Sequence, residues 1–150
     1  KNQIKFMEKN SLDLSFTAYD ILTKQKKFRK EIKTNYNYKD LIKKCDIGLS
    51  TVIIRSKMIK VGTFPNIATQ EDYALWLKYK RNGAKIMGIN KSMSVWRDTP
   101  QSLSSNVFQK LSDSFKVYYK YENKNFLDSI FSVLTLSINK IKNILKVNNL

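Results

Sequence analysis

Apolar and polar positions follow a strand-like pattern in four parts of the chain. Large apolar side chains occupy every second position of residues 12–19, which predicts a strand with one buried face. Residues 50–55 are β-branched and almost continuously apolar, which predicts a strand covered on both faces and therefore central in a sheet. Residues 85–89 and 91–97 are predicted as two further short strands.

Apolar residues three and four positions apart predict helices elsewhere. Residues 1–10 are expected to be the end of a helix that starts before the first residue, and the lysine-rich residues 23–34 to form an exposed hairpin or loop. Further helices are predicted over residues 38–45, 69–81, 104–121 and 126–147, with Thr99 to Ser102 opening the last helical segment. The fold class is therefore α/β with a helical C-terminal end.

The only adjacent pair of acids lies at a predicted helix start, within residues 69–77. Thr69 is expected to cap this helix, with Asp72 in the acidic position of a capping box. Trp76 belongs to a face expected to be buried, whereas Glu71 and Asp72 are expected at the exposed mouth of the helix. A carboxylate there could accept a proton from a substrate hydroxyl, or both acids could only complement the helix dipole.

Composition indicates a folded domain with a strong positive charge. The 150 residues are 42% hydrophobic and 12% aromatic, which excludes a disordered tail and fits one domain of ordinary size. Lys and Arg number 28 against 12 acids, giving a formal net charge of +16. Such a charge favours an anionic partner, whether nucleic acid, an acidic membrane surface or a phosphorylated ligand.

Cysteine and histidine usage excludes two classes of site. Cys45 is the only cysteine and histidine is absent, so neither a disulfide framework nor a His/Cys zinc site is expected. Cys45 itself is predicted to be a small buried side chain at a helix end. No apolar run is long enough to span a bilayer and no signal peptide opens the chain, which predicts a cytoplasmic location.

Six stretches of the chain, taken in order, form a recognisable series that covers most of residues 1–120. They read KNQIKFM (1–7), DLSFTAY (13–19), GLSTVIIR (48–55), FP (64–65), EDYALWL (71–77), and WR (96–97) with SLS (102–104). This series resembles the C-terminal part of family-two glycosyltransferases of bacterial cell-surface polysaccharide synthesis, which have the GT-A fold. A single motif of this kind would be weak, but this series in the family's order and spacing is specific.

The resemblance implies an inverting transferase that moves a sugar from a nucleotide-sugar donor to a glycan or lipid-linked acceptor in cell-envelope polysaccharide synthesis. By this likeness Asp72 is the general base for the acceptor hydroxyl, and Glu71 orients it or contacts the acceptor. Arg97, next to Trp96, resembles a basic residue that could face the leaving diphosphate, since a guanidinium suits phosphate oxygens. Alternatively, Arg97 is a surface arginine near Asp98.

The family's nucleotide-binding half is expected to precede Lys1, because no Asp-x-Asp motif occurs in this chain. The full-length enzyme is expected to use Mg²⁺ or Mn²⁺ with ligands outside this chain. Residues 1–100 would then be the acceptor-side part of a GT-A-like domain and residues 101–150 its C-terminal helices. The fragment alone is expected to be inactive. Histidine, which some relatives use as a metal ligand near the late strand, is also missing.

Two readings from other classes stay open. Aromatics interleaved with lysines in residues 115–126 could stack on nucleic-acid bases, but their helical spacing favours packing and no nucleic-acid-binding signature occurs. The apolar stripe and lysines of residues 126–147 could lie on a membrane surface or act as a scaffold. They could equally pack on their own domain or on a second subunit of a homo-oligomer.

Overall fold

A mixed, four-stranded sheet is built around one central strand, β1 (Leu14–Leu22). The computed structural model describes residues 1–24, 26–30, 32–44, 46–97, 99 and 106–148, with side chains to residue 142. β4 (Ile86–Arg97) pairs with β1 in parallel along its whole length. On the other edge of β1, β2 (Lys27–Lys30) and β3 (Ile53–Ile54) pair antiparallel with its two ends.

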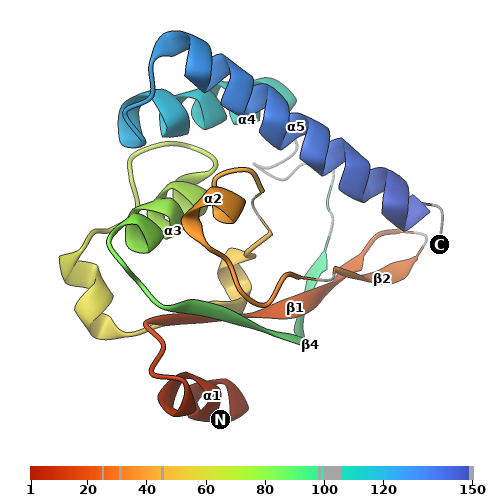
Figure 1. Ribbon diagram of the computed structural model, residues 1–150. Coiled ribbons are helices and arrows are strands. Elements are labelled where there is room, and N and C mark those ends of the chain that lie inside the picture. The colour runs from red at the N-terminus through yellow and green to blue at the C-terminus, as the bar shows by residue number, and fades with distance from the viewer. Residues whose placement is uncertain (25, 31, 45, 98, 100–105, 149–150) are drawn as a thin grey trace.

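Helices lie on both faces of the sheet and form a further layer on one of them (Figure 1). α1 (Asn2–Lys9) covers one face, and α2 (Tyr38–Leu41) and α3 (Glu71–Arg81) cover the other. α4 (Val107–Lys116) and α5 (Phe126–Asn148) lie beyond α2 and α3, farthest from the sheet. The short helices η1 (Leu49–Thr51) and η2 (Ser56–Lys60) flank β3, and the π-helical turn η4 (Val117–Tyr121) continues α4.

The core lies between the sheet and α3. Within it, Leu14 and Phe16 of β1 are fully buried, as are Tyr73, Trp76 and Leu77 of α3 to within 1% exposure. Gly83, with φ of 82°, ends α3 in the left-handed conformation that glycine tolerates. The predicted helix, its buried face and its glycine end are therefore confirmed.

Several other predicted elements are confirmed. The alternating stretch at residues 12–19 forms β1, and the lysine-rich stretch forms a hairpin that ends in β2. Helices α1, α4 and α5 occupy their predicted segments, and the mixed sheet with flanking helices makes the class α/β. The helix predicted over residues 38–45 is shorter than expected, since α2 ends at Leu41. Cys45 and residues 100–102 lie outside the described residues, so their predicted placement is not addressed.

The prediction of a central strand at residues 50–55 is wrong. Only Ile53 and Ile54 pair with β1, at one end of it, and both are partly exposed. On either side of these two residues the backbone forms turns and not strand pairs. Thr51 N–H donates to Gly48 O (2.9 Å), and Met58 N–H donates to Arg55 O (2.9 Å). The central strand is instead β1, whose first five residues are buried on both faces.

The two strands predicted at residues 85–89 and 91–97 are one strand, β4. Its pairing with β1 shifts register between Thr17 and Ala18 and again between Ala18 and Asp20. Such bulges absorb extra residues without ending a strand, which is why Asn90 and Lys91 do not form a turn.

Candidate functional site

The carboxyl ends of the two parallel strands form one edge of a groove. Tyr19 on β1 and Trp96 on β4 line it together with Gly48, Leu49 and Ser50, and its volume is about 520 Å³. In open α/β sheets, ligands bind beyond the carboxyl ends of the parallel strands. This edge of the sheet is therefore the natural place for a substrate.

Helix α3 directs its N-terminus toward the same end of the sheet. It crosses over the sheet and leads through a short turn into the start of β4, so the two run in opposite directions (Figure 1). Glu71 and Asp72 therefore lie toward the end of the sheet at which β4 finishes. The prediction that they lie at an exposed mouth is wrong, because both are only partly exposed.

The predicted capping box at the start of α3 is also wrong. The helix begins at Glu71, and the residue before it, Gln70, has φ of 65° and gives no side-chain cap. The Thr69 hydroxyl donates to a carboxylate on α4 instead of accepting a helix N–H. Asp72 Oδ1 accepts from the adjacent Tyr73 N–H (2.7 Å), so it does not hold the Thr69 backbone either.

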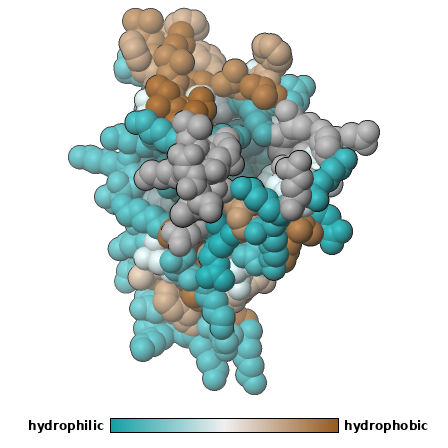
Figure 2. Space-filling view, turned by 90° about the vertical axis from the view of Figure 1, so that its right-hand side faces the viewer, coloured by the Kyte–Doolittle hydropathy of each residue, from teal (hydrophilic) through white to brown (hydrophobic). Residues whose placement is uncertain are grey.

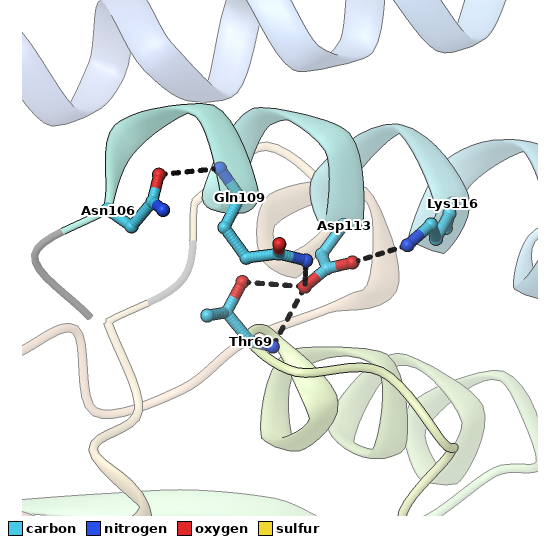
Figure 3. Close-up of polar contacts among 5 residues, drawn as sticks. All are labelled: Thr69, Asn106, Gln109, Asp113 and Lys116. Carbon is cyan, nitrogen blue, oxygen red and sulfur yellow. Dashed lines mark hydrogen bonds and ion pairs between the residues drawn. The ribbon is translucent and has the colours of Figure 1, made fainter. Parts of the chain in front are cut away.

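The carboxylate that holds Thr69 belongs to Asp113, which is fully buried on α4 (Figure 3). Its Oδ2 accepts from the Thr69 N–H (2.9 Å), the Thr69 hydroxyl (3.0 Å) and Gln109 Nε2 (2.9 Å), and its Oδ1 pairs with Lys116 Nζ (2.8 Å). A left-handed non-glycine residue such as Gln70 costs about 1–2 kcal/mol. Asp113 thus fixes the strained turn from which Glu71 and Asp72 emerge.

The two carboxylates have opposite pKa shifts. Burial raises the pKa of Asp72 to about 6, and the nearby Glu71 charge adds to it, against the Tyr73 N–H hydrogen bond that lowers it. Burial also acts to raise the pKa of Asp113, but hydrogen bonds from Gln109, Lys116 and Thr69 outweigh it and lower that pKa to about 2. Asp113 is therefore ionised at neutral pH. Asp72 can gain or lose a proton at a pH close to neutral.

Arg97, the predicted phosphate-binding residue, makes no contact with Glu71 or Asp72 among the described residues. Arg97 ends β4 opposite Leu22, is exposed, and makes no ion pair with a described residue. Asp98 lies outside the described residues. The structure thus brings Trp96 to the groove, and the roles of Arg97, Glu71 and Asp72 stay predictions.

Sequence reasoning assigned no role to several residues around this site. The groove residues Tyr19 and Ser50 belong to stretches that carried the family resemblance, and Gly48 approaches the Tyr19 ring so closely that an added Cβ would lie 3.1 Å from it. Asp113 gave no signal except an acid flanked by Gln109 and Lys116 at helical spacing. Its partner Thr69 comes from a distant part of the chain, so the pair could not be found from local pattern.

The aromatic residues considered for nucleic-acid stacking pack mainly on one another. Tyr118 is fully buried, and its hydroxyl lies 3.1 Å from that of Tyr73. Phe115 stacks on Tyr119, with ring centroids 5.5 Å apart, and meets Phe126 edge to face at 5.5 Å. These contacts favour packing over nucleic-acid stacking for the aromatic residues of this segment.

The described residues do not fit a divalent metal. In this part of the chain, no three or more Asp, Glu, Cys or His side chains come together as a metal site requires.

No protein-family model and no solved structure matches the chain. Curated proteins do. TuaG of Bacillus subtilis strain 168, a glycosyltransferase assigned to teichuronic acid biosynthesis, is 28% identical over 146 residues, which are 95% of this chain and 58% of TuaG. WfaP and WfgD of Escherichia coli are both named UDP-Glc:α-D-GlcNAc-diphosphoundecaprenol β-1,3-glucosyltransferase.

WfaP is 36% identical over 115 residues, 73% of this chain and 44% of its own. WfgD is 31% identical over 144 residues, 93% of this chain and 55% of its own. The chain thus spans about half the length of these curated relatives. Their similarity over most of this chain confirms the resemblance drawn from the sequence motifs: the chain is a relative of bacterial cell-surface glycosyltransferases.

Proposed function

We propose that this chain is the acceptor-side part of an inverting, GT-A-type family-two glycosyltransferase, with Asp72 as its general base. The longer protein would transfer a sugar from a nucleotide-sugar donor to a glycan or lipid-linked acceptor of the cell envelope. The names of the relatives support the substrate classes, since WfaP and WfgD are named for a UDP-glucose donor and a diphosphoundecaprenol-linked acceptor.

The observation that carries the assignment of Asp72 is its environment. It is a partly buried carboxylate at the start of α3, the end of that helix that points the way β1 and β4 run, and burial raises its pKa to about 6. A general base works best when its pKa lies near the working pH, because it is then ionised and still basic enough to take a proton. A surface acid that only complements the helix dipole needs neither burial nor a raised pKa.

In the proposed reaction, the acceptor hydroxyl oxygen attacks the anomeric carbon of the donor sugar. A new carbon–oxygen bond forms as the bond to the donor's phosphate oxygen breaks, and the nucleoside diphosphate leaves with that electron pair. Asp72 accepts the hydroxyl proton as the oxygen becomes acidic, and later releases it to solvent. Attack from the face opposite the leaving group inverts the anomeric configuration.

Other residues have supporting roles in this proposal. Trp96 and Tyr19 would form a wall of the acceptor groove, and Glu71 would orient the acceptor or Asp72. Arg97 would face the diphosphate, where a guanidinium can bind two oxygens at once. A Mg²⁺ or Mn²⁺ ion would assist the leaving group, with its ligands in the other part of the longer protein.

The test uses the longer protein that contains this chain, expressed as wild type and as Asp72→Asn. We expect the substitution to lower sugar transfer by roughly 10²–10⁴-fold, the usual contribution of a general base, with donor binding unchanged. Glu71→Gln is the matched control in the same helical turn and should lower transfer much less. Full transfer by Asp72→Asn would exclude the base, and transfer by the 150-residue chain alone would exclude its description as one part of the enzyme.

A further inference from the structure

Helices α4 and α5 leave a broad apolar surface uncovered. α5 packs inward through Ser129, which is fully buried, and through the partly buried Val133 and Leu136. Its other large apolar residues between Phe126 and Ile141 face away from the core and are between 37% and 66% exposed. Together with the outer residues of α4 they form what we call the α4–α5 apolar face: Phe108, Leu111, Phe126, Leu127, Ile130, Phe131, Leu134, Ile138 and Ile141.

This face is continuous over both helices. The residues from Phe126 to Ile141 recur three and four positions apart and so form one stripe along α5. The contact of Phe115 with Phe126 joins that stripe to the outer side of α4, where Phe108 is 87% exposed. Figure 2 shows hydrophobic side chains gathered at the top of the molecule, over these two helices. A soluble monomer rarely exposes such a contiguous patch unless something binds it.

The charge around the face is positive. Residues 106–148 contain seven lysines and three acids. Two of the acids are buried in ion pairs, Asp113 with Lys116 and Glu122 with Arg81, which leaves Asp128 as the exposed one. Lys120 beside Tyr119 and Lys142 beside Ile141 are both exposed. A second copy of the chain would bring a formal charge of +16 against another +16, whereas an anionic surface complements it.

The length and apolarity of the helices decide whether they could span a bilayer or only lie on its surface. Among the described residues, no helix is long and apolar enough to cross a bilayer. A helix with an apolar stripe and flanking lysines instead lies in the plane of the interface, with the stripe in the acyl region and the cations at the headgroups. Lysines near an anionic membrane add an electrostatic attraction that salt weakens.

We infer that the α4–α5 apolar face docks on the surface of a bilayer that contains anionic phospholipid. The inference comes from the surface itself and goes beyond the proposed sugar transfer. The two fit together, because a lipid-linked acceptor presents its sugar at the membrane surface.

The test is sedimentation of the 150-residue chain with vesicles, either of phosphatidylcholine alone or of phosphatidylcholine mixed with phosphatidylglycerol. We expect binding to the mixed vesicles that weakens as salt is raised. Phe131→Glu with Leu134→Glu should weaken partitioning roughly tenfold or more, because two residues of the stripe become charged. The matched control is Ile4→Glu with Ile59→Glu, which changes the charge equally at two exposed isoleucines on α1 and η2 and should bind like wild type.

Three outcomes would overturn the inference. They are no binding to anionic vesicles at low salt, equal losses in the two double variants, and binding by the chain but not by the longer protein, which would mean that the rest of that protein covers the face. Dimerisation abolished by Phe131→Glu with Leu134→Glu, without vesicle binding, would assign the face to a subunit interface. Circular dichroism checks that both double variants fold. No sugar donor is present, so the result is independent of whether the proposed transferase activity is found.

Discussion

At the scale of single residues, burial of the ionised Asp72 carboxylate lowers the free energy of unfolding. Its pKa is raised to about 6 from an unfolded value near 3.8, so the folded protein holds the proton more tightly than the unfolded chain does. Stability from this group is therefore fully present below about pH 4 and is lost as the pH rises to about 6. Above that, the buried charge is a constant cost to folding.

We predict that Asp72→Asn stabilises the fold by about 1–3 kcal/mol at neutral pH, because it removes the buried charge while an amide oxygen can still accept from the Tyr73 N–H. The difference from wild type should shrink as the pH falls from 6 to 4. Urea unfolding at a series of pH values measures it. A variant less stable than wild type at neutral pH would mean that the carboxylate has a stabilising role as a cap.

Asp113 has the opposite linkage. Its folded pKa of about 2 lies below its unfolded value, so its contribution is present above about pH 4 and is lost as the pH falls toward 2. We predict that Asp113→Ala destabilises the chain by about 2–4 kcal/mol, since it leaves buried donors of Thr69 without a partner. Asp113→Asn retains an acceptor oxygen and should cost less. Urea unfolding of both variants is the measurement, and equal losses would show that the Lys116 ion pair alone matters.

At the scale of the secondary-structure elements, β4 contains a close contact at Gly88 that its sequence pattern does not predict. A Cβ on Gly88 would lie 2.7 Å from the Phe16 ring and from Ile32 Cδ1, both in the core. Glycine therefore lets β4 approach β1 and its covering side chains at this point. The β-branched stretch at residues 50–55 shows the reverse, since its composition favours a strand but few of its residues find a partner strand.

We predict that Gly88→Ala destabilises the chain by about 1–2 kcal/mol, because the added methyl group overpacks the core. Part of that cost is offset, since alanine loses less backbone entropy on folding than glycine does. Gly62→Ala is the matched control. An added Cβ there would lie 2.5 Å from Lys78 Nζ, but Lys78 is exposed and its flexible end can move away. Thermal unfolding compares the two, and similar shifts in Tm would mean that the contact with Phe16 is not a constraint.

For the molecule as a whole, several polar contacts bind the C-terminal helices to the rest. Asp113 on α4 holds Thr69, and Glu122 after η4 pairs with Arg81 at 3.0 Å and accepts from the Tyr38 hydroxyl. The buried hydroxyls of Tyr73 and Tyr118 both donate to Ile42 O, at 2.8 and 2.9 Å. These contacts join α4 and η4 to α2, to α3 and to the turn before α3.

We predict from these contacts that the chain unfolds in one cooperative transition. Far-UV circular dichroism, which reports mainly on the helices, and fluorescence of the buried Trp76 should give the same midpoint. Removal of residues 106–150 should abolish that transition, because it exposes the surface that Tyr118 covers. Two separated transitions in the intact chain would instead indicate that the C-terminal helices fold as an independent unit.

The sequence by itself determined the elements whose signals are local. Alternation over residues 12–19, helical spacing from Tyr73 to Leu77, and Gly83 after Arg81 express preferences of neighbouring residues, and β1 and α3 follow from them. The ordered motifs also pointed to the glycosyltransferase relatives. Only the tertiary structure decided which strand is central and that β4 is unbroken. It also decided that the Thr69 hydroxyl bonds to Asp113 and does not cap α3, and that Asp72 is partly buried. These features depend on pairings between residues far apart in the chain, whose energies no local pattern contains.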